Sequence, residues 1–125
     1  MSRVASFEIH YTGYLDQHGE LAGKGADIPR DPEPLIAYYR IMVLTRTFDT
    51  KAIALQRTGK LGTYASSLGQ EAIGAVVGTL MRPEDVLLTS YREYAAQFLR
   101  GVSMVEILRY WGGDERGMDF EVPRE

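Results

Sequence analysis

Residues 63–100, TYASSLGQEAIGAVVGTLMRPEDVLLTSYREYAAQFLR, decide the fold of this chain, because they include most of its residues with chemical or close-packing potential. The segment opens with a polar loop around Tyr64 and Ser66 and continues into a stretch rich in glycine and alanine. A turn at Pro83 then leads into a short β-prone run that ends at Tyr91-Arg92. We expect the rest of the chain to support this segment.

A helix is predicted over residues 68–80. The four residues from Ser67 to Gln70 fit a capping box, in which the serine hydroxyl and the glutamine side chain satisfy each other's backbone N–H groups. Gly74 and Gly78 lie four residues apart inside this helix, and each glycine costs about 1 kcal/mol relative to alanine. Close approach of another backbone would offset that cost. The sequence leaves open whether that backbone belongs to the same subunit or to a second one.

Residues 86–90, Val-Leu-Leu-Thr-Ser, form a short, unsegmented β-prone run, which is typical of a buried parallel strand. Tyr91 and Arg92 follow at its C-terminal end, the edge where open α/β sheets bind ligands. Arginine offers a planar, permanently charged fork that suits phosphate or carboxylate. On the residues alone, a surface or ion-paired role for Arg92 is favoured over ligand binding.

Three further helices are predicted near residues 33–57, 92–100 and 104–111. Asp31-Pro32 suits the start of the first helix, since aspartate caps free N–H groups and proline lacks the donor that would be unpaired there. Helical spacing predicts a core face for that helix, made of Leu35, Tyr38, Met42, Phe48, Ala52 and Leu55. Its charged residues are predicted to lie mainly on the solvated side: Arg40, Arg46, Asp49 and Lys51.

The sequence divides the chain into two parts, residues 1–30 and residues 31–125. Residues 1–30 are predicted to form an extended arm, in which residues 7–12 alternate apolar with polar as a half-buried strand does. Residues 31–125 form the remaining domain. In it, residues 103–106 fit a second capping box, and Gly59 and Gly113 suit helix ends.

Composition excludes several functional classes. The absence of cysteine excludes disulfides, thiolate metal sites and cysteine nucleophiles. A net charge of −3 without blocks of like charge does not suggest a nucleic-acid partner. No apolar run approaches the roughly 20 residues needed to cross a bilayer, and no signal peptide is recognised, so we expect a cytoplasmic protein. The histidines, His10 and His18, are expected to be structural or solvated, and no catalytic or metal-binding residue is identified.

Several spaced motifs occur in order along residues 35–117. They are Arg46 with Asp49, Gly59-Lys60-Leu61, the Tyr64 loop, Gly69-Gln70-Glu71-Ala72, the turn at Asp85, Tyr91-Arg92 and Arg100-Gly101. Together they resemble the N-terminal part of the alpha subunit of thiamine-diphosphate-dependent 2-oxo acid dehydrogenases, the first component of the pyruvate and branched-chain complexes. The arm over residues 7–21 is similar to the N-terminal extension of bacterial forms.

This resemblance implies an incomplete α/β thiamine-diphosphate-binding fold, with the fragment itself mainly α-helical and containing one or two short strands. It implies that Tyr91 and Arg92 contact the cofactor diphosphate, and that Tyr64 and Ser66 lie near the substrate entrance. It also places the following residues at a subunit interface: Gly69, Gln70, Glu71, Gly74 and Gly78.

The implied activity is oxidative decarboxylation of pyruvate or branched-chain 2-oxo acids, with acyl transfer to a lipoyl group. The implied partners are a beta subunit in an α2β2 assembly and a lipoyl-bearing acyltransferase. The cofactor is thiamine diphosphate with Mg²⁺, but the family's Gly-Asp-Gly…Asn metal-holding segment has no counterpart here, so the fragment alone is expected to be inactive. Tyr94 and Ala65 stand where many members have histidines. The alternatives are a non-catalytic helical interaction module derived from the family, or an unrelated small binding domain.

Overall fold

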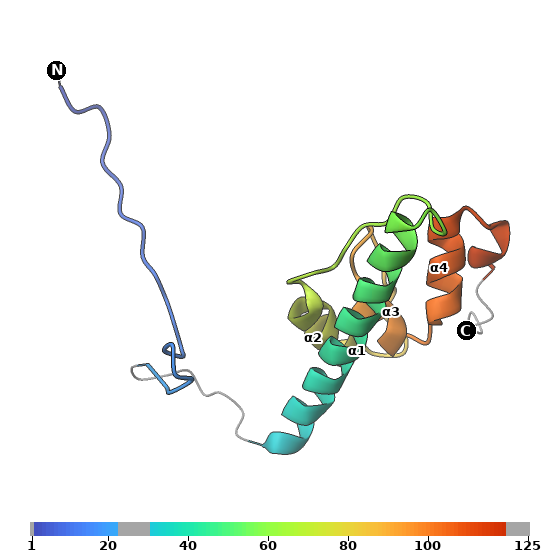
Figure 1. The fold of residues 1–125 in the computed structure, drawn as a ribbon. Coiled ribbons are helices and arrows are strands. Elements are labelled where there is room, and N and C mark those ends of the chain that lie inside the picture. The colour runs from blue at the N-terminus through green and yellow to red at the C-terminus, as the bar shows by residue number, and fades with distance from the viewer. Residues whose placement is uncertain (1, 23–30, 120–125) are drawn as a thin grey trace. The chain divides into compact units, whose positions relative to one another are not determined.

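The computed structural model describes residues 2–22 and 31–119, and the chain divides into two units, Met1–Asp31 and Pro32–Glu125. The described part of the second unit is helical (Figure 1). Its elements are α1 (Pro32–Arg57), α2 (Glu71–Leu80), α3 (Tyr94–Leu99), α4 (Met104–Gly112) and the short 3-10 helix η1 (Glu115–Gly117). All four predicted helices are therefore present, with α2 and α3 shorter than predicted.

The other helices lie beside the second half of helix α1, and its first turns project beyond them (Figure 1). Its buried residues are Thr45, Phe48, Asp49 and Ala52. The predicted core face is thus correct at Phe48 and Ala52. It is wrong at Leu35, which is 43% exposed because no described element covers the first turns. As predicted, the chain turns at Gly59, whose φ of +70° is a left-handed conformation that suits glycine.

The core of the second unit is aromatic. The ring of Phe48 packs edge-on against the rings of Tyr64, Tyr94 and Phe98, with centroid distances between 5.2 and 6.3 Å. Trp111 of α4 adds an edge contact to Tyr64 at 5.7 Å. Such edge contacts stabilise aromatic pairs beyond their buried area. Four segments distant in the sequence therefore meet at one cluster.

Helices α2 and α3 approach closely because two residues of α2 have no side chain. A Cβ atom built on Gly74 would lie 3.0 Å from the Cβ of Ala95, and one on Gly78 would lie 2.8 Å from the Cα of Ala96. The small face of α2 is therefore occupied within the chain. This contact is the compensation that two helical glycines require.

The predicted capping box of α4 is confirmed. The Ser103 hydroxyl accepts from the Glu106 N–H, and the Glu106 carboxylate accepts from the Ser103 N–H at 2.6 Å. The predicted box at Ser67 is wrong, because α2 begins at Glu71 and the Ser67 hydroxyl is bonded elsewhere. Gly69 also has a φ of +87°, which no helix residue adopts.

The prediction of one or two short strands is wrong for the described residues. Residues 86–90 run without a ladder partner there, and Val86 and Leu88 are largely exposed. Residues 7–12 of the first unit likewise have no partner, and their apolar side chains are exposed. A β-strand needs a neighbour for its backbone groups, and the described residues supply none.

Within the first unit, the described order is local. Leu15 and Leu21 form an antiparallel bridge, and the Asp16 carboxylate between them accepts the N–H groups of His18 and Glu20. Residues 23–30 of the predicted arm lie outside the described residues. None of the helices described in either unit has the length and apolar character that a bilayer crossing requires.

Candidate functional site

The Tyr64 loop is held to α1 by one buried carboxylate. Asp49 Oδ1 accepts the Tyr64 hydroxyl at 2.9 Å, the Ser67 N–H at 2.7 Å and the Ser67 hydroxyl at 3.3 Å. Its Oδ2 accepts the Ser66 hydroxyl at 2.7 Å. A buried carboxylate is costly unless its oxygens are hydrogen-bonded, and here both are. The loop therefore has one definite position on α1.

One turn earlier, Arg46 joins α1 to the start of α2. Its Nε donates to Glu71 Oε1 at 2.5 Å, and Glu71 Oε2 accepts the Gly69 N–H at 3.0 Å. The hydrogen bond from Arg46 lowers the pKa of the Glu71 carboxyl, and the same bond raises the pKa of Arg46. The Arg46 and Asp49 pair, three residues apart on one helical face, thus fixes both ends of residues 64–71.

Tyr64 and Tyr94 form a stacked pair behind this loop. Their ring centroids are 5.4 Å apart and their planes differ by 11°, and both side chains are buried. The Tyr94 hydroxyl donates to the Ala65 carbonyl at 2.7 Å. Burial raises the pKa of both hydroxyls, so each remains a neutral donor at physiological pH. Tyr94 of α3 thereby holds the loop through its backbone.

Tyr91 and Arg92 lie in a tight turn that precedes α3. The Glu93 carboxylate closes this turn, accepting the N–H groups of Ser90, Tyr91 and Arg92 at 3.0–3.1 Å and the Ser90 hydroxyl at 2.9 Å. Burial of the Glu93 carboxyl opposes its ionisation, but these hydrogen bonds outweigh burial and lower its pKa. The backbone that carries Tyr91 and Arg92 is therefore fixed locally.

The Arg92 guanidinium lies between this turn and the Tyr64 loop. One of its Nη1 N–H groups donates to the Ser66 carbonyl, and its carbon lies 5.1 Å from the centre of the Tyr91 ring. Among the described residues, its other N–H groups have no protein acceptor, although a guanidinium has five donors. Arg92 is half-buried and Tyr91 half-exposed, so an anion has access to both.

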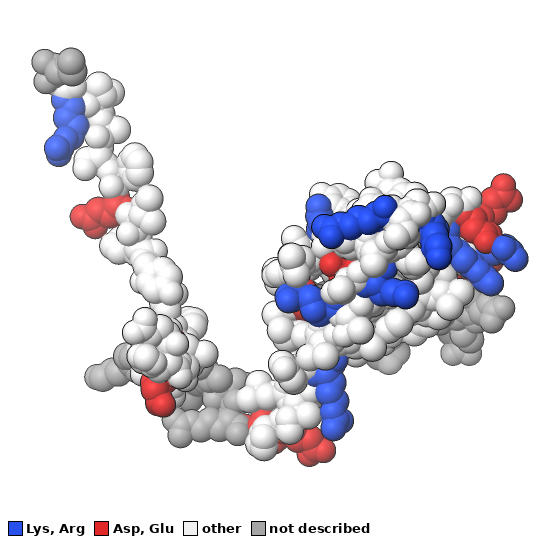
Figure 2. All heavy atoms as spheres, in the orientation of Figure 1, with Lys and Arg blue, Asp and Glu red and all other residues white. Residues whose placement is uncertain are grey.

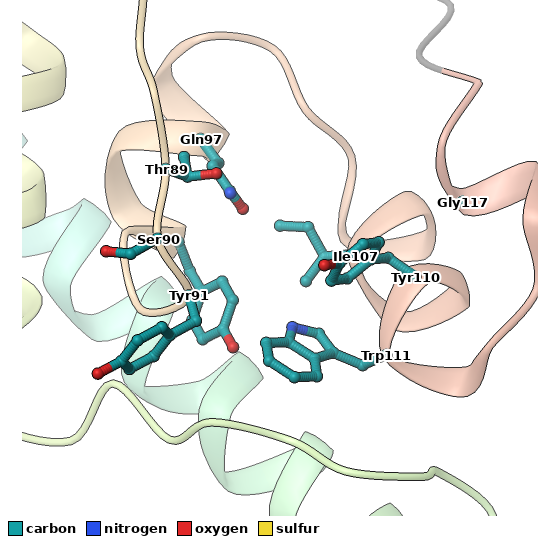
Figure 3. Close-up of a pocket in the computed structure, with 9 residues that line it drawn as sticks. Thr89, Ser90, Tyr91, Gln97, Ile107, Tyr110, Trp111 and Gly117 are labelled. Carbon is teal, nitrogen blue, oxygen red and sulfur yellow. The ribbon is translucent and has the colours of Figure 1, made fainter.

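A cavity of about 220 Å³ lies beside Tyr91, between the 89–91 segment with α3 and helix α4 (Figure 3). Four of its nine lining residues are aromatic, and three of these, Tyr91, Tyr110 and Trp111, are seen around the open space in Figure 3. Arg92 lines a different, smaller cavity of about 80 Å³ with Gln70 and Gly74. Tyr91 and Arg92 thus touch each other but face separate hollows.

The structure brings part of the predicted site together. The Ser66 carbonyl accepts from Arg92, which is 26 residues away in sequence. Tyr64, 28 residues from Arg92, lies in the same loop, and its hydroxyl and that of Ser66 both bind Asp49. Gln70 and Gly74 reach the same hollow as Arg92. Gly78 lies further along α2 against α3, and Gly69 and Gln70 are exposed. The interface role of these residues and of Glu71 stays a prediction.

Sequence reasoning missed Asp49, which it placed on the solvated side of α1. The signal was present, since Asp49 falls at helical spacing among the buried residues Thr45, Phe48 and Ala52. A carboxylate at such a position requires donors from another segment. Glu93 was also missed, because a carboxylate that binds its neighbours' backbone has no distinct sequence pattern.

The described residues show no concentrated basic patch on the visible face and no metal-binding group. Figure 2 shows basic side chains spread over the visible face of the helical unit and separated by uncharged atoms. Among the described residues, no group of three or more histidine, cysteine or acidic side chains could hold a metal ion.

Comparison with known proteins finds one family model that matches, described as "Dehydrogenase E1 component", over residues 39–121. The chain is 35% identical over 102 residues to the pyruvate dehydrogenase E1 component subunit alpha of Acholeplasma laidlawii, covering 82% of this chain and 30% of that one. It is 32% identical over 106 residues to the Mycoplasma genitalium subunit, covering 85% of this chain and 30% of that one. It is 30% identical over 106 residues to the subunit of Staphylococcus aureus (strain Mu50), covering 85% of this chain and 29% of that one. The chain therefore spans about a third of the length of these relatives. No solved structure matches it.

Proposed function

The chain belongs to the dehydrogenase E1 component family, and we propose that it forms the N-terminal part of the alpha subunit of a thiamine-diphosphate-dependent 2-oxo acid dehydrogenase. The observation that carries this proposal is the position of Arg92, half-buried and held by the Ser66 carbonyl with its other donors unoccupied by the described protein. The family resemblance assigns that residue to the cofactor diphosphate.

The described residues fit the anionic end of that cofactor. A diphosphate needs cationic and N–H donors, and Arg92 offers a fork of them beside the Tyr91 ring. When bound, the cofactor would supply the electron sink for decarboxylating pyruvate or a branched-chain 2-oxo acid. Arg92 and Tyr91 would bind and orient it, while Tyr64 and Ser66 would line the substrate entrance. The Mg²⁺ ligands would come from a part of the alpha subunit that these residues do not include.

The same proposal includes a beta subunit, an α2β2 assembly and transfer of the acyl group to a lipoyl-bearing acyltransferase in the cytoplasm. Support for a subunit contact comes from a face of α2 that is exposed in the structure. That face exposes four apolar side chains at helical spacing, Ile73, Val76, Val77 and Leu80. The 2-oxo acid substrate, the beta subunit and the acyltransferase are implied by the family and await direct test.

Calorimetric titration of thiamine diphosphate, with Mg²⁺ in excess, into the complete alpha subunit assembled with its beta partner tests this proposal. A charge-assisted hydrogen bond contributes about 1.5–3 kcal/mol, so Arg92→Ala should weaken binding roughly tenfold to a hundredfold. Arg92→Lys keeps the charge but not the fork and should recover only part of that loss. Tyr91→Phe, which removes one hydroxyl, should cost less.

Unchanged affinity in the Arg92→Ala assembly would reject the site and favour a non-catalytic interaction module. Residues 1–125 alone should bind the cofactor too weakly to detect and should not decarboxylate a 2-oxo acid. Tight binding by that fragment would show that the proposed need for further segments is wrong.

A further inference from the structure

The donors and the acceptors of the Tyr64 loop bind different partners. The Tyr64 and Ser66 hydroxyls and the Ser67 N–H all donate to Asp49 of α1. The Ala65 carbonyl accepts from Tyr94, and the Ser66 carbonyl accepts from Arg92. Each of these donors is within two residues of one of the acceptors, so a shift of the loop toward or away from α1 moves both carbonyls.

The residue at position 49 must accept on both of its side-chain oxygens. Oδ1 receives Tyr64 and Ser67, and Oδ2 receives the Ser66 hydroxyl. An asparagine of the same shape keeps one acceptor but turns an NH₂ group toward its remaining neighbour. The Ser66 oxygen already accepts the Leu68 N–H at 3.2 Å, so its own hydrogen would lose its acceptor. Asp49→Asn therefore changes the side-chain volume little, and its main effect is that the Ser66 hydroxyl loses its hydrogen-bond acceptor.

The Ser66 carbonyl is the only acceptor that Arg92 has among the described residues. An arginine side chain has many rotamers, and fixing one of them before a ligand arrives reduces the entropy cost of binding. We infer that Asp49 is a positioning residue for the proposed cofactor site, which holds the Ser66 carbonyl where it orients Arg92 toward the diphosphate. This inference rests on the proposed function.

A double-mutant cycle tests the inference, because it measures whether Asp49 acts through Arg92. The dissociation constant of thiamine diphosphate, with Mg²⁺ in excess, is measured by calorimetry in the complete alpha and beta assembly. The proteins are the wild type, Asp49→Asn, Arg92→Ala and the double variant. Asp49→Asn should weaken binding about threefold to tenfold when Arg92 is present, and less than about twofold when it is absent.

Glu71→Gln is the matched control. It is also an isosteric amide at a buried carboxylate between α1 and the loop region, but Glu71 bonds Arg46 and Gly69 and does not touch the loop carbonyls. Any loss of affinity that it causes should be the same with and without Arg92. Thermal unfolding of every variant separates lost stability from lost coupling.

The inference would be overturned if Asp49→Asn weakened cofactor binding by the same factor with and without Arg92, or if it had no effect when Arg92 is present. Either result would leave the proposed function in place. An Arg92→Ala variant with unchanged affinity would instead refute the proposed function. Should Asp49→Asn fail to assemble, Ser66→Ala replaces it, since it removes only the hydroxyl bonded to Oδ2. It should weaken binding about twofold to fivefold, again only when Arg92 is present, and equal factors would contradict the coupling.

Discussion

Gly78→Ala should destabilise the chain, although alanine is the better helix former. Alanine gains about 1 kcal/mol over glycine in a helix interior. Against that gain, the new Cβ would lie 2.8 Å from the Cα of Ala96, 2.9 Å from the Cδ1 of Leu99 and 3.0 Å from its Cβ. The Leu99 methyl could rotate away, but the Cα of Ala96 belongs to the α3 backbone and could move only with that helix.

Overpacking of this kind typically costs about 1–3 kcal/mol. Because the closest contact is with backbone, we expect the upper part of that range and a net loss of about 1–2 kcal/mol. Gly112→Ala is the matched control, since a Cβ there would meet only the Cδ1 of Leu61 at an ordinary 3.8 Å. That control should leave stability unchanged or raise it by up to about 1 kcal/mol.

Urea unfolding followed by circular dichroism measures both variants against the wild type, with the midpoint read at an unchanged slope. A Gly78→Ala protein that is as stable as the wild type would refute the close approach of α2 and α3. The same result for Gly78→Ala and Gly112→Ala would mean that helix propensity, and not packing, decides the outcome at both positions.

Two further predictions concern association and pH. Residues 1–125 expressed alone should self-associate through the exposed α2 face, and placing glutamate at Ile73 and Leu80 should shift sedimentation toward monomer; a wild-type monomer that binds no hydrophobic dye would contradict this. The Arg46 hydrogen bond lowers the pKa of Glu71 below its ordinary 4.5, so this carboxylate stabilises the fold above that pH and loses its contribution as the pH falls. Stability should therefore decline as the pH falls below about 4.5, and Glu71→Gln should show a smaller decline in the same unfolding assay.

Local signals predicted the helices well. The extent of α1, the capping box at Ser103 and the left-handed glycines at 59 and 113 are all decided by neighbours in sequence, and the structure confirms them. Long-range contacts explain the errors. Ser67 could have capped a helix, but Asp49 binds it instead, and α2 starts only at Glu71.

The candidate site was predicted in part. Tyr91 and Arg92 were identified by their place after a β-prone run, yet that run forms no strand, because the described residues include no neighbouring strand to pair with it. The family resemblance pointed to the Tyr64 loop. No sequence pattern, however, showed that its Ser66 carbonyl would reach Arg92 or that Tyr94 would stack on Tyr64. Those contacts depend on how three separate segments fold together.

The first turns of α1 are exposed and its later turns are packed, and this difference has a consequence for insertions in the helix. Each residue turns a helix by about 100°, so an insertion between Arg46 and Asp49 would rotate one of these side chains away from its partners on residues 64–71. An insertion before Thr45 would rotate only the first turns, which the described residues leave uncovered. Natural length variation in this helix is therefore expected to collect before Thr45, with the later turns kept in register.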